Sequence, residues 1–295
     1  MPIFSYRVFV AIVEHKSFAA AARAMHMTPS AVSHSINTLE NKLGVTLFRR
    51  GRDGASLTEE GDVILREVLA VLNAEEHLSE TLARIQGLEC GLVKIGTFNS
   101  VCINWIPAIV TTFRKQHPKI EISINQGSYA DVLEWLDQGL VDIGFLSLTS
   151  CGDTDIVELF QDRMLCIAPA SFRPARPDHV TIEDIRDQNF VYQRAGYDAE
   201  TNAFLGRYGV TVNSVFTVEN DDAIVALVES GFGICLTPEL VEKKIIHNAS
   251  VYPIEPACYR TICLATAKKR QLSVAAQKMH AHIVNFCRET DLQAL

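Results

Sequence analysis

The chain has 295 residues, of which 48% are hydrophobic and 21% are charged. This length exceeds one typical domain, so we expect two or three globular units, each with its own core. No apolar run reaches the roughly 18 residues that cross a bilayer. Arg7, Glu14, Lys16 and Arg23 fall within the first thirty residues, where a signal peptide would be apolar. Membrane and secreted classes are therefore excluded, and we expect a soluble cytoplasmic protein.

The formal net charge is −8, but this charge is distributed unevenly along the chain. Residues 1–58 contain seven Lys and Arg against three Asp and Glu, a local net charge of +4, which leaves −12 for the remainder. Non-specific affinity for DNA comes from the neutralisation of phosphates by basic side chains. We therefore expect a small basic head to meet DNA and a large acidic body to serve another purpose.

The eight cysteines are spread along the chain and form no C-x-x-C pair. Tetrahedral zinc sites usually need paired ligands a few residues apart. A disulfide framework is typical of secreted chains, which this one does not resemble. We therefore interpret the cysteines as reduced core thiols and expect neither a metal nor a cofactor.

The head shows strong local signals for helix ends. Ser17 is a suitable N-cap for a second helix, which follows a first apolar helical pattern. Thr28 followed by Pro29 predicts the start of a third helix, because a hydroxyl caps it and proline fits where no N–H is needed. Gly44 is the expected end of this helix. The tight connection between the second and third helices predicts a helix-turn-helix.

The third helix has two contrasting faces. Its apolar positions share the buried face: Val32, Ile36, Leu39 and Leu43. The opposite face is short, polar and almost uncharged: Ser30, His34, Asn37 and Asn41. Such a face suits the reading of base edges in the major groove. We therefore expect this helix to be the recognition helix.

The stretch SFAAAARAMHMTPSAVSHSINTLENKLGVTLFRR (residues 17–50), followed by LTEEG (57–61), resembles the N-terminal signature of the LysR family nearly position for position. The resemblance implies a winged helix-turn-helix DNA-binding domain at 1–58. It also implies contacts to bases or nearby phosphates from five residues: Thr28, Ser30, Ser33, His34 and Asn37. Three arginines beside the wing would grip the DNA backbone: Arg49, Arg50 and Arg52.

Structural roles stay open for several of these residues. Ser33 lies on the flank of the apolar face, where its hydroxyl can bond the backbone, and Asn41 can be merely solvated. His34 can be a neutral surface histidine; the family often has arginine at that position. Arg49 and Arg50 can form an exposed charge pair, although the glycine-containing turn after them favours phosphate contact.

A long linker helix is predicted over residues 59–90. A heptad seam runs along it, with one charged interruption: Ile64, Val68, Val71, Glu75, Leu78, Leu82 and Ile85. A second apolar stripe is expected to pack on the head: Leu65, Leu69 and Leu72. Two apolar faces favour a helix that pairs with a second copy of the chain as well as with its own domain. The alternative is a helix that packs only within its own chain.

Apolar runs and helical patterns alternate from residue 91 to the end of the chain. Strands are expected at 92–96, 120–125, 142–147, 164–168, 190–193, 215–219, 233–237 and 260–266. Helices are expected after 101, from 130, over 199–208, from 221 and over 274–288. This rhythm predicts an α/β fold with a mainly parallel sheet. Segments 260–266 and 274–288 are expected to return to the first part of this region.

Three motifs of this region resemble the effector domain of LysR regulators: GTFNS (96–100), VDIGFL (141–146) and ESGFGICLTP (229–238). The resemblance implies a two-lobed, periplasmic-binding-protein-like effector domain at 91–295. Lobe I would comprise about 91–162 and 267–295, and lobe II about 163–266.

A small-molecule effector is expected in a cleft between the lobes, because ligands of such sheets bind at the carboxyl ends of strands. The candidate effector contacts are the polar residues at those ends: Thr97, Asn99, Ser100, Ser128, Gln193, Arg194, Tyr197 and Asn220. Helix N-termini with hydroxyl and amide side chains favour anions, so a carboxylate is the expected effector. Ordinary helix capping is the alternative for each residue taken singly.

Three alternative functions make different demands on the sequence. An enzyme is disfavoured because the sequence has no nucleophile motif, no phosphate-binding glycine loop and no metal-spaced cluster. A redox sensor would depend on Cys151 and Cys166, near the expected crossover between lobes, and a thiol titration with oxidant would reveal it. A ligand-binding protein without DNA affinity would fail to bind duplex DNA.

The sequence as a whole predicts a DNA-binding transcription regulator of the LysR type that is controlled by an effector. We expect it to bind double-stranded DNA at an interrupted inverted repeat, because two paired recognition helices read a palindromic site. The resemblance also implies a homotetramer, with dimers formed through the linker helix.

Overall fold

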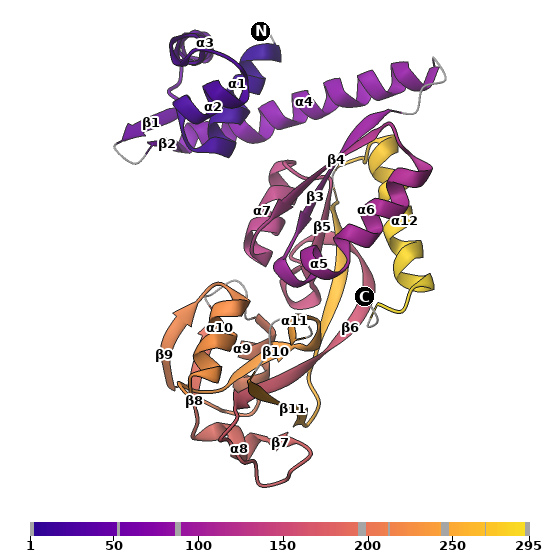
Figure 1. Ribbon diagram of the computed structural model, residues 1–295. Helices are drawn as coiled ribbons and strands as arrows, with labels where there is room; N and C mark the ends of the chain where they lie inside the picture. The colour runs from indigo at the N-terminus through magenta and orange to yellow at the C-terminus, as the bar shows by residue number, and fades with distance from the viewer. Residues whose placement is uncertain are drawn as a thin grey trace. The chain divides into compact units, whose positions relative to one another are not determined.

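The computed structural model describes residues 3–51, 54–85, 90–193, 199–211, 213–242, 248–268 and 270–292 (Figure 1). The chain divides into two compact units. The N-terminal unit is Met1–Gly91 with Gln138–Leu140, and the C-terminal unit is Leu92–Asp137 with Val141–Leu295. Among the predicted contact residues, Arg52, Arg194 and Tyr197 lie outside the described residues.

The N-terminal unit contains three helices, a two-stranded wing and a long helix (Figure 1). In chain order they are α1 (Ile3–His15), α2 (Phe18–Ala24), α3 (Pro29–Leu43), β1 (Phe48–Gly51), β2 (Gly54–Leu57) and α4 (Glu59–Ile85). The expected caps are present. Ser17 Oγ accepts from Ala20 N at 3.4 Å, and Thr28 Oγ1 accepts from Ala31 N at 3.2 Å. Gly44 ends α3 in the left-handed conformation, which glycine adopts without steric cost.

The core of this unit joins all of its helices. Val32, Ile36 and Leu39 of α3 are buried against residues of α1 and α2. From α4, the predicted stripe Leu65, Leu69 and Leu72 joins the same core. A core of this kind holds α3 so that its polar face points outward.

The predicted heptad seam of α4 is wrong at Val68, which is 4% exposed and belongs to the core of its own unit. Val68 lies on the helix between the predicted seam and the stripe of Leu65, Leu69 and Leu72. It packs with that stripe in the core of its own unit. Further along, the seam residues are exposed: Val71, Leu78, Leu82 and Ile85. Leu78 is 60% exposed and Ile85 is 75% exposed. The second half of α4 therefore presents an apolar stripe without a partner in its own unit.

The C-terminal unit begins with alternating strands and helices. Its first part contains β3 (Gly91–Thr97), α5 (Asn99–Asn104), α6 (Ile106–Gln116), β4 (Ile120–Gln126), α7 (Tyr129–Gln138), β5 (Ile143–Ser147) and the short 3-10 helix η1 (Leu148–Ser150). The long strand β6 (Thr154–Pro169) leads out of this part, and β12 (Tyr259–Ala267) leads back to α12 (Val274–Glu289) (Figure 1). Together these elements enclose one large apolar core.

Between the two crossover strands lies the second lobe. It contains β7 (Val180–Thr181), α8 (Ile182–Arg186), β8 (Asn189–Gln193), α9 (Ala199–Arg207), β9 (Asn213–Val218), α10 (Asp221–Glu229), β10 (Cys235–Pro238), α11 (Glu239–Glu242) and β11 (Ala249–Glu255). Two smaller apolar clusters form its core. Lobe I denotes the part of this unit around β3, β4 and β5, and lobe II denotes the part from β7 to β11.

One sheet of the order β4-β3-β5-β12-β6-β11-β7 passes through both lobes. β3 and β5 are parallel, but β12 is antiparallel to both β5 and β6, and β10 and β11 are antiparallel to β6. The predicted mainly parallel sheet is therefore wrong for this sheet. The antiparallel pairs arise because two long strands carry the chain out of lobe I and back again.

The crossover strands also set where the lobes meet. β6 pairs with β12 as far as Arg163 and with β10 and β11 from Met164 onward. The predicted lobe boundary at residue 267 is too late, because β12 already pairs with β5 of lobe I from Ile262 to Ala265. β12 begins at the junction of the lobes, at Tyr259, and most of it lies in lobe I.

Candidate functional site

The outer face of α3 is the candidate DNA-reading surface. Thr28, Ser30, His34 and Asn37 are exposed, and Ser33 is half-buried. Thr28 and Ser30 share a hydrogen bond of 3.0 Å between their hydroxyls at the start of the helix. The structure thus brings the five predicted residues to one end and one face of α3, with the capping role of Thr28 added to them.

Glu40, which sequence reasoning did not single out, ties the wing to the recognition helix. Its Oε1 accepts from the backbone N–H of Leu47 at 2.7 Å and of Phe48 at 3.4 Å. The tip of the wing is held from the other side, where Ala55 N donates to Lys16 O at 2.9 Å. A Cβ at Gly54 would lie 2.4 Å from that same oxygen. These contacts fix the wing relative to α3, a precondition for one protein to grip two parts of a DNA site.

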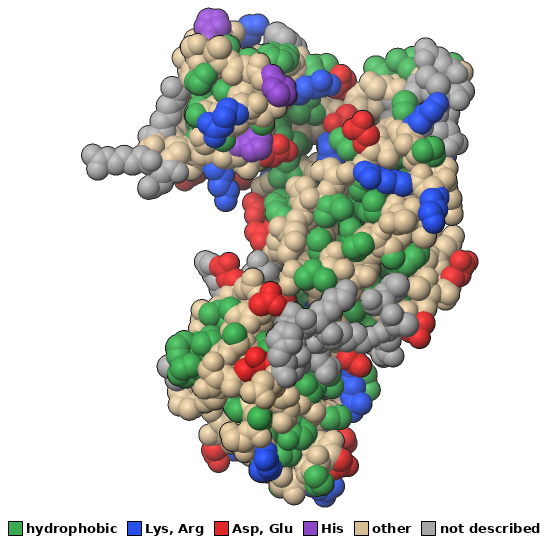
Figure 2. Space-filling model, in the orientation of Figure 1, with side chains coloured by type: hydrophobic (Ala, Val, Ile, Leu, Met, Phe, Trp, Pro, Cys, Tyr) green, Lys and Arg blue, Asp and Glu red, His purple; other side chains and the backbone are tan. Residues whose placement is uncertain are grey.

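Basic side chains surround this surface. Arg49 on β1 is exposed, as are Arg23 and Lys42. On the face that Figure 2 draws, Lys, Arg and His side chains gather over the N-terminal unit. Arg50 lies on β1 next to Arg49, and its side chain is outside the described residues. The basic side chains are suited to contact DNA phosphates. The uncharged outer face of α3, which lies among them, is suited to contact base edges.

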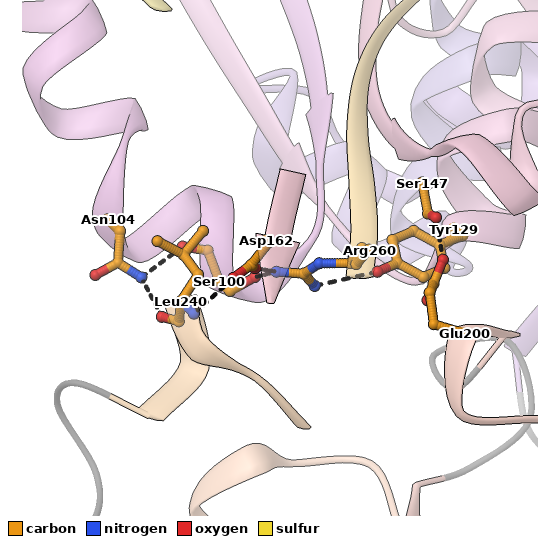
Figure 3. A network of polar contacts seen from close by, with 8 residues as sticks. All are labelled: Ser100, Asn104, Tyr129, Ser147, Asp162, Glu200, Leu240 and Arg260. Carbon is orange, nitrogen blue, oxygen red and sulfur yellow. Dashed lines mark hydrogen bonds and ion pairs between the residues drawn. The ribbon is translucent and has the colours of Figure 1, made fainter. Parts of the chain in front are cut away.

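The candidate effector site begins with a buried network where the crossover strands meet (Figure 3). Arg260 of β12 is 4% exposed and donates to Asp162 of β6 at 2.6 Å. It also donates to Ser100 Oγ at 2.9 Å and to the Tyr129 hydroxyl at 3.2 Å, both in lobe I. The other oxygen of Asp162 accepts from Leu240 N of lobe II at 3.1 Å. The network therefore joins both lobes to both crossover strands.

The electrostatics of this network follow from its burial. Desolvation raises the pKa of Tyr129 to about 12, so its hydroxyl keeps its proton at neutral pH. Desolvation lowers the pKa of Arg260, but the interactions with Tyr129 and Asp162 outweigh it and raise the pKa further above its usual range. A guanidinium paired in this way is a fixed structural charge rather than a group that titrates.

A second contact between the lobes centres on Asp221, at the start of α10. Its two carboxylate oxygens accept from Asn99 Nδ2 of lobe I at 2.8 Å and from Gln193 Nε2 of lobe II at 3.0 Å. Gln126 Nε2 donates to Asn99 Oδ1 at 3.0 Å. Desolvation is the main cause of a raised pKa for Asp221. Two predicted effector residues, Asn99 and Gln193, thus meet on a carboxylate that sequence reasoning missed.

Glu200 forms a third contact between the lobes. This residue of α9 is 6% exposed, and its Oε1 accepts from the hydroxyls of Ser147 and, at 2.6 Å, of Thr149 in lobe I. In Figure 3 its carboxylate points at Ser147 and lies beside the ring of Tyr129. No ion pair to Glu200 is found among the described residues. A nearly buried carboxylate here is therefore held by hydroxyl groups.

The remaining predicted effector residues make contacts within their own lobes. Thr97 is fully buried and donates to Phe98 O at 3.3 Å. Ser128 forms a capping pair with Asp131 at the start of α7, with its hydroxyl and N–H both bonded to the carboxylate. Asn220 is exposed and caps α10. The alternative of ordinary capping thus describes Ser128 and Asn220.

A pocket on the lobe II side of these contacts is lined by apolar side chains with a few polar groups. Its lining includes Phe190, Tyr192, Ile224 and Val225, with Gln193, Thr201, Asp221 and Thr237 as the polar members. Small-molecule sites commonly combine an apolar wall with a few fixed polar groups. All of its lining residues belong to lobe II or to β6, and two of them, Gln193 and Asp221, also form the second contact between the lobes.

The cysteines differ in their surroundings: Cys235 lines this pocket, and a hydrogen bond with Cys263 lowers the pKa of Cys151. All eight cysteines are free, and five of them are buried: Cys151, Cys166, Cys235, Cys263 and Cys287. Burial raises the pKa of the Cys166 thiol, which makes it a poor nucleophile. Across the described ranges, no group of three His, Cys, Asp or Glu side chains is placed to hold a metal ion. Within the same ranges, no helix has the length and apolar character to cross a membrane.

Comparison with protein-family models assigns both units. Residues 4–62 match the model of the bacterial regulatory helix-turn-helix proteins of the lysR family, and residues 86–288 match the LysR substrate binding domain. The chain belongs to the LysR family. The predicted winged helix-turn-helix and two-lobed effector domain are confirmed, and the protein is a DNA-binding transcription regulator of the LysR type with an effector-binding domain. The matching families are regulators and not enzymes.

Individual relatives agree with this LysR assignment. The chain is 29% identical over 280 residues to the uncharacterized HTH-type transcriptional regulator YvbU of Bacillus subtilis, covering 94% of this chain and 96% of YvbU. Full-length CbnR complexed with its target DNA has the same fold, with a TM-score of 0.67, 19% identity and coverage of 97% and 100%. The effector binding domain of QuiR in complex with shikimate gives a TM-score of 0.63 at 20% identity, over 68% of this chain and 98% of QuiR.

Proposed function

We propose that this LysR regulator reads an interrupted inverted repeat in double-stranded DNA through α3 and the wing, and that a small molecule bound between lobes I and II controls it. The observation that carries the proposal is the pair of surfaces described above. One is a polar, uncharged helix face flanked by arginine, and the other is the junction of lobes I and II, where polar side chains from both lobes are hydrogen-bonded. Site residues on the DNA side are Thr28, Ser30, Ser33, His34, Asn37, Arg49, Arg50 and Arg52.

Two copies of the chain would pair through the exposed stripe of α4. Leu78, Leu82 and Ile85 are apolar, and each is more than half exposed in the single chain. Burial of such side chains is favourable by roughly 25 cal/mol for each Å² removed from water. Pairing supplies the second recognition helix that an inverted repeat requires. Association of two dimers into a tetramer, in the cytoplasm where the DNA target lies, completes the proposal.

The proposed effector is a carboxylate that binds where lobes I and II meet. The cleft residues Asn99 and Gln193 carry amide donors, and Ser147 and Thr149 carry hydroxyl donors. QuiR, which has the same fold, is a relative whose structure contains shikimate. Arg194 and Tyr197 remain candidate contacts from the sequence.

The experiment that tests DNA reading is a selection of fragmented host genomic DNA by the purified chain, followed by sequencing. We expect enrichment of a few sites that share an interrupted inverted repeat. Replacement of Ser33 and His34 by alanine should remove this enrichment, whereas Ser79→Ala, an exposed serine of α4, should leave it intact. Equal enrichment by both variants would contradict the assignment of α3 as the reading element.

A separate measurement distinguishes base readout from phosphate contact. Arg49→Gln should weaken binding to selected and random DNA by a similar factor, and it should lower the slope of log affinity against log salt by about 1. A loss confined to the selected site would instead place Arg49 on a base.

A further inference from the structure

We propose that Ser147 and Thr149 form a carboxylate-binding site of lobe I that Glu200 of the same chain fills when no effector is present, and that the effector's carboxylate takes over this site. The inference rests on the proposed function, since it concerns the effector cleft. It goes further by naming the donors, the ligand group and an internal competitor.

The donors are placed where an α/β sheet binds ligands. Ser147 is the last residue of β5, whose five residues are all buried, and Thr149 follows in the short helix η1. Ligands of such sheets bind outside the carboxyl ends of the strands. Ser147 is fully buried, whereas Thr149 is exposed, so one donor is fixed in the core and the other lies at the rim. The site therefore lies at the edge of the core rather than deep inside it.

The group that holds these donors comes from the other lobe. Glu200 belongs to the first turn of α9 in lobe II, 53 residues from Ser147 in the sequence. Its carboxylate is almost completely removed from water, which is costly for a charge unless strong partners replace the lost hydration. The partners seen in the described part of the chain are two neutral hydroxyls. Both hydroxyls donate to Oε1 of Glu200, so the site recognises only a carboxylate oxygen. The carboxylate of another molecule could accept the same two bonds.

Tyr129 connects this position to the Arg260 network. Tyr129 lies beside the carboxylate, and the charge of Glu200 contributes to the raised pKa of Tyr129 (Figure 3). Arg260 donates a hydrogen bond to the hydroxyl oxygen of Tyr129 at 3.2 Å. Arg260 forms its ion pair with Asp162, and the described residues show no direct ion pair at the Glu200 site.

Internal occupation makes Glu200 a competitor of the effector. A carboxylate ligand has to displace Glu200 before the hydroxyls are free, so its apparent affinity in the wild-type chain is lower than that of the empty site. Removal of the Glu200 carboxylate should expose the site to small carboxylates that the wild-type chain does not bind.

The test is chemical rescue of Glu200→Ala in the full chain, with acetate as the probe. Acetate equals the part of the side chain that this substitution removes. Thermal unfolding is followed by tryptophan fluorescence, which reports on the C-terminal unit because Trp105 and Trp135 both lie there. Acetate at ten times its dissociation constant shifts the folding equilibrium about elevenfold, which raises Tm by about 3–6 °C for a unit of this size.

Matched controls separate a carboxylate site from general effects of salt. Chloride at equal ionic strength and acetamide, the neutral isostere, should leave the Tm of Glu200→Ala unchanged. Glu183→Ala removes an exposed glutamate of lobe II and should show no acetate effect, like the wild-type chain. Addition of Ser147→Ala and Thr149→Val to Glu200→Ala should abolish the rescue.

Equal stabilisation by acetate and acetamide would overturn the proposal, as would an acetate effect that survives loss of both hydroxyls. If Glu200→Ala folds poorly without additive, the folded yield after refolding in acetate or in acetamide gives the same comparison. The assay uses neither DNA nor the natural effector. Failure of the proposed regulatory function would therefore leave its result unchanged, and the two failures can be told apart.

Discussion

Replacement of Asp162 by alanine should destabilise the C-terminal unit strongly. The substitution leaves Arg260, which is 4% exposed, without its carboxylate partner at 2.6 Å. Breaking a buried ion pair from one side costs about 3–5 kcal/mol, because the remaining charge stays buried and uncompensated. Leu240 N also loses its acceptor, which adds to the cost. For a unit of this size we expect Tm to fall by about 6–20 °C.

The assay is thermal unfolding of the full chain, followed by tryptophan fluorescence. Asp153→Ala is the matched control, because Asp153 pairs with Lys268 at the exposed surface and should leave Tm unchanged. The double variant Asp162→Leu with Arg260→Met should regain most of the lost stability, since apolar groups of similar size often replace a buried pair at little cost. A Tm of Asp162→Ala equal to that of Asp153→Ala would refute the reasoning.

Three further predictions concern other parts of the molecule. Gly61→Ala should unfold the N-terminal unit and abolish DNA binding, because its Cβ would lie 2.2 Å from Leu47 O; gel-shift and circular dichroism measurements check this. Leu82→Asp should shift the chain toward monomer in sedimentation, whereas His77→Asp, at an exposed polar position, should not. Asp221 has a raised folded pKa, so its contribution to stability falls as pH rises from its ordinary value of 3.8 through the folded value. Asp221→Asn should remove that slope from unfolding measured between pH 3 and 7, and an unchanged slope would contradict it.

Local signals explain why the N-terminal unit was predicted well. The Ser17 and Thr28 caps, Pro29 and Gly44 each act within one helical turn, so the residues that decide the structure are neighbours in the sequence. Val68 shows the limit of this reasoning. Its position fits both the seam and the packed stripe of α4, and only the three-dimensional core of its own unit decides between them.

The cleft was predicted less completely because its contacts join distant segments. Asp162 and Arg260 are 98 residues apart, and Asn99 and Asp221 are 122 residues apart. No periodicity or motif connects such pairs. Strand ends placed Asn99 and Gln193 at the edge where the lobes join, but the carboxylate on which these two residues meet depends on how the two lobes fold together.

The contacts between the lobes are of two energetic kinds, and this difference determines which of them an effector can change. Arg260 and Asp162 face each other on the paired crossover strands β12 and β6, and loss of either partner would leave the other charge buried at a cost of about 3–5 kcal/mol. The bonds from Ser147 and Thr149 to Glu200 are exchanged for bonds to water when the lobes part, at a net cost of about 1.5–3 kcal/mol each. A ligand shifts an equilibrium only by its difference in affinity for the two states. A small carboxylate that replaces Glu200 makes the same two bonds, so it can release lobe II at this point while the Arg260 network holds the crossover strands together.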